Sequence, residues 1–125
     1  MKLRMRGNSV RLRLLRAEVD ALAKGEDVVE SVAFAPGQKI EYAIASDPHG
    51  AAMRAAFDGT RVSVFVPAAM AREWGHSEVV GIEHDQLIGD GSMLQILIEK
   101  DFACLQPREG DEDNGTFANP KREAP

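Results

Sequence analysis

The sequence predicts an α+β fold, in which a largely antiparallel curved sheet or small open barrel carries two short helices and a loose C-terminal tail. Six to eight short segments alternate apolar and polar residues with the period of two that is typical of half-buried strands. Two short segments have helical spacing instead. Because long helices do not alternate with the strands, we do not expect a doubly wound parallel sheet.

The size and composition are those of one small domain. The chain has 125 residues, of which 44% are apolar and 28% are charged, and this suffices for a single core. We expect a single α+β domain over residues 1–107. Beyond it the composition becomes acidic and rich in proline and glycine, so we expect a flexible tail over residues 108–125.

The first strands are predicted on either side of Gly7 and Asn8. The apolar residues before Gly7 have odd numbers, and those after Asn8 have even numbers. A two-residue hairpin loop at this point would align the apolar faces, but it would place Arg4 opposite Arg11, where like charges repel. A single strand interrupted by a bulge fits the pattern equally well. The sequence leaves both interpretations open.

A short helix is expected over residues 16–24. Val19, Leu22 and Ala23 have the spacing of one helix face, and Gly25 is a natural C-cap. Leu15 stands where a serine or threonine would cap the helix, and its side chain cannot accept a hydrogen bond. The alternation then predicts strands over these residues: 28–34, 39–45, 53–57 and 60–66.

The pair Asp58-Gly59 predicts a type I′ hairpin turn between two of these strands. Pro67 suits the first position of a second helix, which we expect over residues 68–74. Two more strands follow, over residues 78–83 and 92–102, and the second of them is the most apolar in the chain. We find no internal repeat of useful period.

Positive charge is concentrated at the start of the chain. Residues 1–16 hold six basic residues and no acidic one, although the whole chain has a net charge of −5. An acidic chain argues against general nucleic-acid binding, which needs concentrated and unopposed cations. The basic segment therefore either packs beside acidic strands or forms a local face for an anion or a partner.

Six residues on the predicted strands are candidates for ligand binding: Arg4, Arg6, Arg11, Arg13, Glu99 and Asp101. Guanidinium groups present fork-shaped donors that suit phosphates and carboxylates. Glu99 and Asp101 share one face of a strand, roughly 7 Å apart at ~3.3 Å per residue. They would either neutralise the arginines or act as a general acid and base. Lys100 points the opposite way, and we expect it to reach solvent at the end of the strand.

No metal site, catalytic residue or cofactor is expected. His49, His76, His84 and Cys104 lack the spacing of metal ligands. Nothing that flanks Cys104 matches a catalytic motif, and a lone cysteine in such a run is typically a small core residue. We also find neither a signal peptide nor a membrane span of ~20 apolar residues, and we expect a cytoplasmic protein.

The opening KLRMRGNSVRLRL and the later segment ILIEKDFACLQPR resemble an uncharacterised bacterial family, a domain of unknown function of about this length. Glu18-Val19 in the first helix and Phe117 with Asn119-Pro120 also carry the resemblance. It covers most of the chain, and it implies a single domain in the bacterial cytosol. It implies no activity and no catalytic residues.

Two functions fit these observations. The first, which we favour, is a non-enzymatic binding or interaction module that uses its basic strand face for an anionic small molecule or an acidic protein surface. A second copy of the chain can supply that acidic surface, which would make a homo-oligomer. The alternative is a small enzyme for a phosphorylated or carboxylated metabolite, with Glu99 and Asp101 as its carboxylate pair.

Overall fold

The computed structural model describes residues 1–102, which form two helices and eight strands in two mixed sheets. The predicted α+β class is confirmed, and neither sheet closes into a barrel. The elements in chain order are β1 (Lys2–Met5), β2 (Ser9–Leu14), α1 (Arg16–Ala23), β3 (Val28–Ala35), β4 (Gln38–Asp47), β5 (Arg54–Phe57), β6 (Arg61–Pro67), α2 (Ala68–Gly75), β7 (Gly81–Leu87) and β8 (Met93–Lys100). The predicted tail over residues 108–125 and Cys104 lie outside the described residues.

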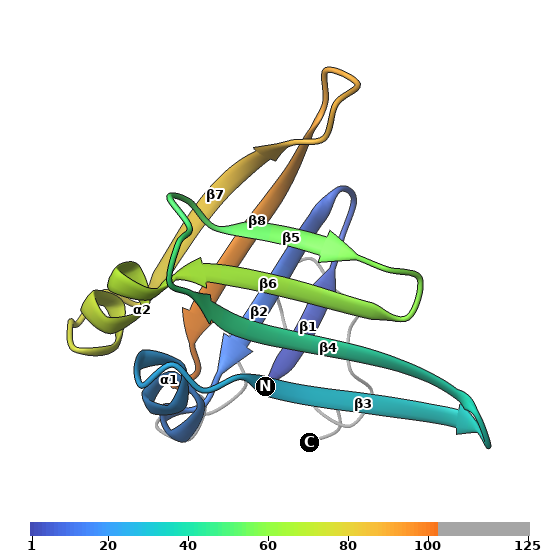
Figure 1. Ribbon diagram of the computed structural model, residues 1–125, viewed down its shortest axis with the longest axis horizontal. Helices are drawn as coiled ribbons and strands as arrows, with labels where there is room; N and C mark the ends of the chain where they lie inside the picture. Colours follow the sequence, from blue (N-terminus) through green and yellow to red (C-terminus); the bar gives the residue numbers. More distant parts are fainter. Residues whose placement is uncertain (103–125) are drawn as a thin grey trace, which may run out of the picture.

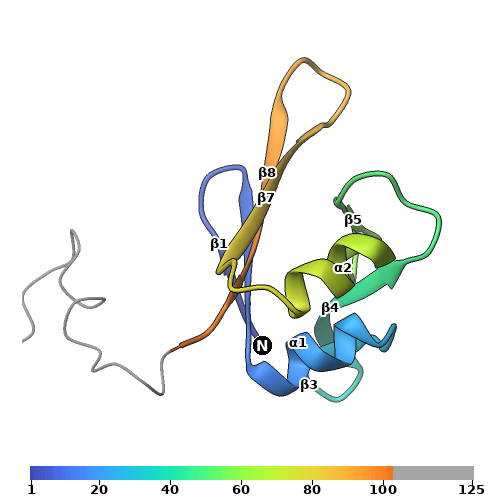
Figure 2. The same ribbon diagram turned by 90° about the vertical axis from the view of Figure 1, so that its left-hand side faces the viewer.

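Each sheet consists of two antiparallel hairpins that are joined by a parallel pair in the middle. The first sheet has the strand order β1-β2-β8-β7, and β2 runs parallel to β8. The second sheet has the order β3-β4-β6-β5, and β4 runs parallel to β6. The sheets face each other with their strands crossing (Figure 1), and the two helices pack together at one end between them (Figure 2).

The first two strands form a hairpin, so the structure decides between the two interpretations of Gly7 and Asn8. Met5 lies opposite Val10, and Arg4 lies opposite Arg11, in an antiparallel register. Gly7 has a positive φ of 57°, which glycine adopts without steric cost. The bulged single strand is therefore excluded.

The turn between β5 and β6 differs from the predicted type I′ turn. Phe57 lies opposite Val62, and the Asp58 N–H donates to the Arg61 carbonyl at 3.3 Å. The central residues are therefore Gly59 and Thr60, and Gly59 alone of the two has a positive φ, of 98°. A type I′ turn needs positive φ at both central positions, whereas type II′ needs it at the first. The type I′ prediction was wrong because the turn begins one residue later than expected.

The chain repeats one structural unit, although its sequence shows no repeat. Each half consists of a hairpin, a helix and a second hairpin. In the first hairpins, Lys2 opposite Arg13 corresponds to Arg54 opposite Phe65, so equivalent positions lie 52 residues apart. In the second hairpins, Val28 lies opposite Ile44, and the equivalent pair of residues lies 54 residues later in the chain. Each sheet takes one hairpin from each half, and neither half has a complete sheet of its own.

The core lies between the two sheets and against the helices. Leu12 on β2 and Val64 on β6 occupy equivalent positions, as do Leu22 on α1 and Trp74 on α2, and all four are buried. The repeat therefore preserves burial rather than residue identity. The largest fully buried side chains are Leu12, Leu14, Leu22, Ile44, Val64, Val66, Ile96 and Ile98.

Lys100 ends β8 beside this core. Its Nζ donates to the Ser77 carbonyl at 2.7 Å, and it lies 5.4 Å from the centre of the Trp74 ring. The half-buried ammonium is therefore hydrogen-bonded where the strand leaves the core. Neither helix in residues 1–102 has the length and hydropathy that crossing a membrane requires.

Replacing Ile98 with alanine should lower the free energy of unfolding by about 2–5 kcal/mol, because it leaves a cavity in a fully buried site. Leu87→Ala is the matched control, since Leu87 is 72% exposed and should change stability by less than about 0.5 kcal/mol. Urea denaturation measures both. Equal effects of the two substitutions would contradict this description of the core.

Candidate functional site

The basic face is the outer surface of β1 and β2, made by the cationic side chains Lys2, Arg4, Arg6, Arg11 and Arg13. The period of two turns Leu3 and Leu12 towards the core, so Arg4 and Arg11 point away from it as an opposed pair. Arg6 lies in the turn that follows β1. Arg4 and Arg6 are exposed, whereas Arg11 is half-buried. The basic face is therefore an open surface rather than the lining of a barrel.

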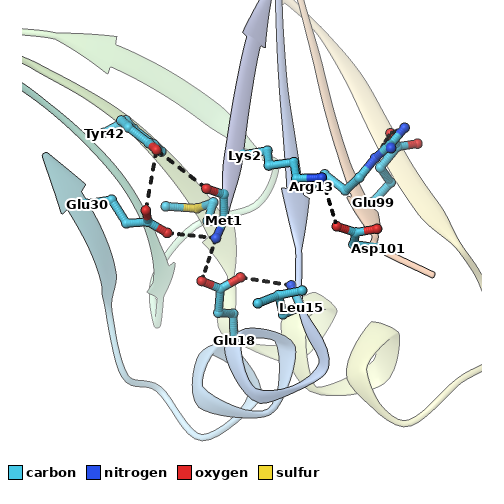
Figure 3. Close-up of polar contacts among 9 residues, drawn as sticks. All are labelled: Met1, Lys2, Arg13, Leu15, Glu18, Glu30, Tyr42, Glu99 and Asp101. Carbon is cyan, nitrogen blue, oxygen red and sulfur yellow. Dashed lines mark hydrogen bonds and ion pairs between the residues drawn. The ribbon is translucent and has the colours of Figure 1, made fainter. Parts of the chain in front are cut away.

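Glu99 on β8 binds two of these arginines. The parallel register of β2 and β8 places Arg13 beside Glu99. Arg13 donates from Nε and Nη2 to Glu99 Oε1, at 3.1 and 3.0 Å (Figure 3). Arg11 Nε lies 3.7 Å from the same oxygen. One carboxylate thus compensates part of two positive charges, and Arg13 is the more firmly held of the two.

Asp101 binds the beginning of the first strand. Its Oδ2 lies 3.6 Å from Lys2 Nζ, and its N–H donates to the Leu14 carbonyl at 2.8 Å. The Asp101 side chain is almost fully buried, at 4% exposed, whereas that of Lys2 is 68% exposed. Within residues 1–102, no ion pair involves Arg4 or Arg6.

A shallow depression of about 150 Å³ lies on the same face. Its lining residues are Ser9, Val10, Arg11, Glu83, Gln95 and Leu97. Pockets for drug-sized ligands usually measure 300–1,000 Å³, so this one is small. Among the predicted site residues only Arg11 lines it. The sequence did not identify Glu83 and Gln95 as site residues, because the pairing of β8 with both β2 and β7, which brings them there, leaves no local pattern.

The charge of this outer surface changes sign across the first sheet. Glu83 and Asp85 on β7 lie opposite Leu97 and Gln95 on β8, on the side that faces away from the core. The basic strands β1 and β2 lie at the opposite edge of the same sheet, and β8 separates them from β7. A partner that covers this surface therefore meets cations at one edge and carboxylates at the other.

A second polar cluster surrounds the α-amino group of Met1. This ammonium group donates to Glu18 Oε2 and to Glu30 Oε2, both at 2.7 Å (Figure 3). The Tyr42 hydroxyl lies 3.4 Å from both Glu30 Oε1 and the Met1 carbonyl. Burial alone would lower the pKa of the Met1 amine, but the hydrogen bonds and charges of the two carboxylates outweigh burial and raise it.

Glu18 also completes the start of α1. Its Oε1 accepts a hydrogen bond from the Leu15 N–H at 2.8 Å. This hydrogen bond is the half of a capping box in which the side chain of a helix residue accepts from the N-cap N–H. The other half is missing, because the Leu15 side chain cannot accept a hydrogen bond. Burial raises the pKa of the nearby Tyr42 hydroxyl, and the charge of Glu30 adds to the effect. The sequence analysis missed this cluster because it depends on contacts between distant segments.

A third cluster lies on the outer face of the second sheet. Glu41 Oε1 accepts from Arg61 Nε at 2.9 Å, and its Oε2 lies 3.2 Å from Lys39 Nζ. The hydrogen bond from Arg61, followed by that from Lys39, lowers the pKa of Glu41. Across the part of the chain that the structure describes, no group of three potential metal ligands comes together.

Comparison with known families places the chain in one of them. The model of a family of unknown function (DUF7009) matches residues 1–121, and the chain belongs to this family. Its membership agrees with the uncharacterised domain that the opening segment and the ILIEKDFACL segment suggested. A search of proteins with curated functions found no similar chain, and a search of solved structures found none either.

The Met1 amine should make stability decrease at alkaline pH. Its pKa is raised in the folded chain above the ordinary value of 8.0, so its contribution is complete below pH 8. The contribution is lost as the pH rises through the folded pKa. Urea denaturation at intervals from pH 7 to about 9.5 measures it, below the range in which lysines titrate. Glu30→Gln should flatten the decrease, and an unchanged slope in this variant would contradict the assignment.

Proposed function

We propose that this protein is a non-enzymatic interaction module whose basic face binds an acidic segment of a partner protein. The main support is the imbalance of charge on that face, where five cations meet the two carboxylates of Glu99 and Asp101. Arg4 and Arg6 are exposed and make no ion pair within residues 1–102. Their donors are thus available to carboxylates from outside.

The arrangement of the cations favours an extended partner over a small metabolite. The depression next to Arg11 is too small to enclose most ligands. The cations instead form two rows along β1 and β2. In an extended peptide, side chains on one side recur every roughly 6.6 Å, which is also the spacing between Arg11 and Arg13 along their strand. Alternate acidic side chains of a bound strand would therefore match these rows.

The acidic character of the whole chain does not oppose this binding. Charges separated by more than about 8 Å are largely screened at physiological salt. A bound carboxylate therefore responds mainly to the local cations of the basic face. The acidic residues of β7 lie at the opposite edge of the same outer face, and they would restrict the position of the partner rather than exclude it.

The carboxylate pair gives less support to an enzyme. Glu99 Oε1 already accepts two hydrogen bonds from Arg13, and Asp101 binds Lys2. Neither carboxylate lines the depression beside Arg11. A general acid or base needs to reach the proton that it transfers, and these two side chains are engaged elsewhere.

The bacterial and cytoplasmic setting is part of the same proposal. It is supported by the likeness of the opening KLRMRGNSVRLRL and of the segment ILIEKDFACL to the bacterial family considered above. A cytosolic module of this kind would meet its acidic partner among other soluble proteins.

Binding is tested with a fluorescent ten-residue polyglutamate peptide and fluorescence anisotropy at low salt. We expect saturable binding that weakens as salt increases. The double substitution Arg4→Glu with Arg6→Glu should weaken binding at least tenfold, a loss of about 1.4 kcal/mol or more. Arg72→Glu on α2 changes the charge of one exposed arginine away from the basic face, and it should leave the affinity nearly unchanged.

The same variants separate a binding role from a structural one. Arg4 opposite Arg11 is an unfavourable pair, so Arg4→Glu should leave stability unchanged or raise it by up to about 1 kcal/mol. A stable variant that no longer binds supports the proposal. Loss of stability in Arg4→Glu, absence of peptide binding by the natural chain, or an equal loss in Arg72→Glu would overturn it.

A further inference from the structure

The two sheets end in four edge strands, and three of these are protected against pairing with another chain. Edge strands expose unpaired N–H and C=O groups, and natural proteins shorten or charge them to prevent association. β1 and β5 have four residues each. β7 is longer, but it carries Glu83, His84 and Asp85. Self-pairing along β7 would bring like charges close together.

β3 is neither short nor rich in charge. It is eight residues long, and among residues 1–102 it pairs on one side only, with β4. A β-bulge between Ala33 and Ala35 interrupts the ladder only near the end of the strand, so residues 28–33 form a regular edge. Its sequence VVESVAFA contains one charged residue, and every residue from Ser31 to Ala35 is exposed. β3 and the adjoining part of β4 extend beyond the rest of the second sheet (Figure 1). This is the longest and least charged free edge in the described chain.

The single charge on β3 is partly neutralised within the chain, by an ammonium group that Glu30 shares with Glu18. Glu30 binds the Met1 ammonium at 2.7 Å and lies within 3.4 Å of the Tyr42 hydroxyl. Two β3 strands that meet edge to edge therefore bring together one partly compensated charge from each chain. The other exposed side chains along this edge are apolar or small, although the chain as a whole carries −5.

We infer that β3 is a dimerisation edge, which pairs with β3 of a second copy of this chain. Antiparallel pairing about a two-fold axis gives each strand the same hydrogen bonds, and a closed symmetric dimer results. The two second sheets would then form one continuous sheet of eight strands. This surface lies on the second sheet, so the inference goes beyond the binding proposed for the basic face of the first sheet.

The exposed apolar surface supports a second copy as the occupant. Four large side chains lie on β3 or next to it, with exposed fractions of 43% for Val29, 46% for Val32, 69% for Phe34 and 46% for Ile40. A specific interface needs on the order of 1,000 Å² of total buried surface. β3 offers eight residues of strand edge together with these side chains, and a symmetric dimer doubles that contribution.

Sedimentation of the full chain over a range of concentrations from about 1 to 200 µM tests the inference. We expect a monomer–dimer equilibrium. The double substitution Val32→Lys with Phe34→Lys removes apolar contacts and places cations across the two-fold axis, and it should raise the dimer dissociation constant at least tenfold. Leu87→Lys makes the same change on the other long edge, β7, and should leave it unchanged.

Hydrogen exchange of the unmodified chain supplies a measurement that needs no variant. The backbone amides of residues 28–35 should become more protected as the concentration rises, while those of β7 should not. A chain that stays monomeric at every concentration overturns the inference, and so does a dimer that Leu87→Lys weakens more than the β3 variant. Peptide binding by the basic face is measured separately, so either proposal can fail alone.

Discussion

The position of the first strand depends on the buried ammonium group of Met1. This group begins β1 of the first sheet, while its two carboxylates belong to α1 and to β3 of the second sheet. Glu18 at the same time completes the start of α1 through the Leu15 N–H. One cation therefore links a strand, a helix and the opposite sheet. β1 alternates from this start, and Leu3 packs against the core, so Lys2 and Arg4 face outward.

The second half of the structural repeat makes the equivalent junction without charges. Met53 occupies the position of Met1 and is 2% exposed, and Met70 and His84 stand where the first half has Glu18 and Glu30. Among the described residues, a hairpin, a helix and a second hairpin are therefore joined here without an ion pair. Buried ion pairs often stabilise no more than apolar side chains of similar volume. We interpret the charged junction as one that specifies where β1 begins, rather than as the main source of stability.

Local patterns predicted the elements well, and pairing between distant strands limited the rest. Both helices follow from the spacing of apolar residues, whereas the first hairpin was one of two interpretations that the sequence left open. The strand that was expected over residues 78–83 lies instead at Gly81–Leu87. Its inward positions include the polar residue His84, so the alternation of apolar and polar residues that predicts a strand is weak there. The parallel pairing of β2 with β8 joins segments 86 residues apart and leaves no local trace. For the same reason, the sequence identified the arginines of the candidate site but not Glu83 or Gln95 beside them.

The placement of Arg4 opposite Arg11 is an unfavourable feature of the fold, because like charges on paired strands repel each other. A hairpin is more stable with unlike charges opposite each other, and the rest of β1 and β2 follows the rules of alternation and turn chemistry. Conflicts of this kind are expected where a surface serves a function rather than stability. Glu99 relieves the conflict only in part, since it binds Arg11 and Arg13 and makes no ion pair with Arg4. An acidic partner would complete the neutralisation, and pairing of two chains through β3 would present two basic faces to it, which strengthens binding if both can be engaged at once.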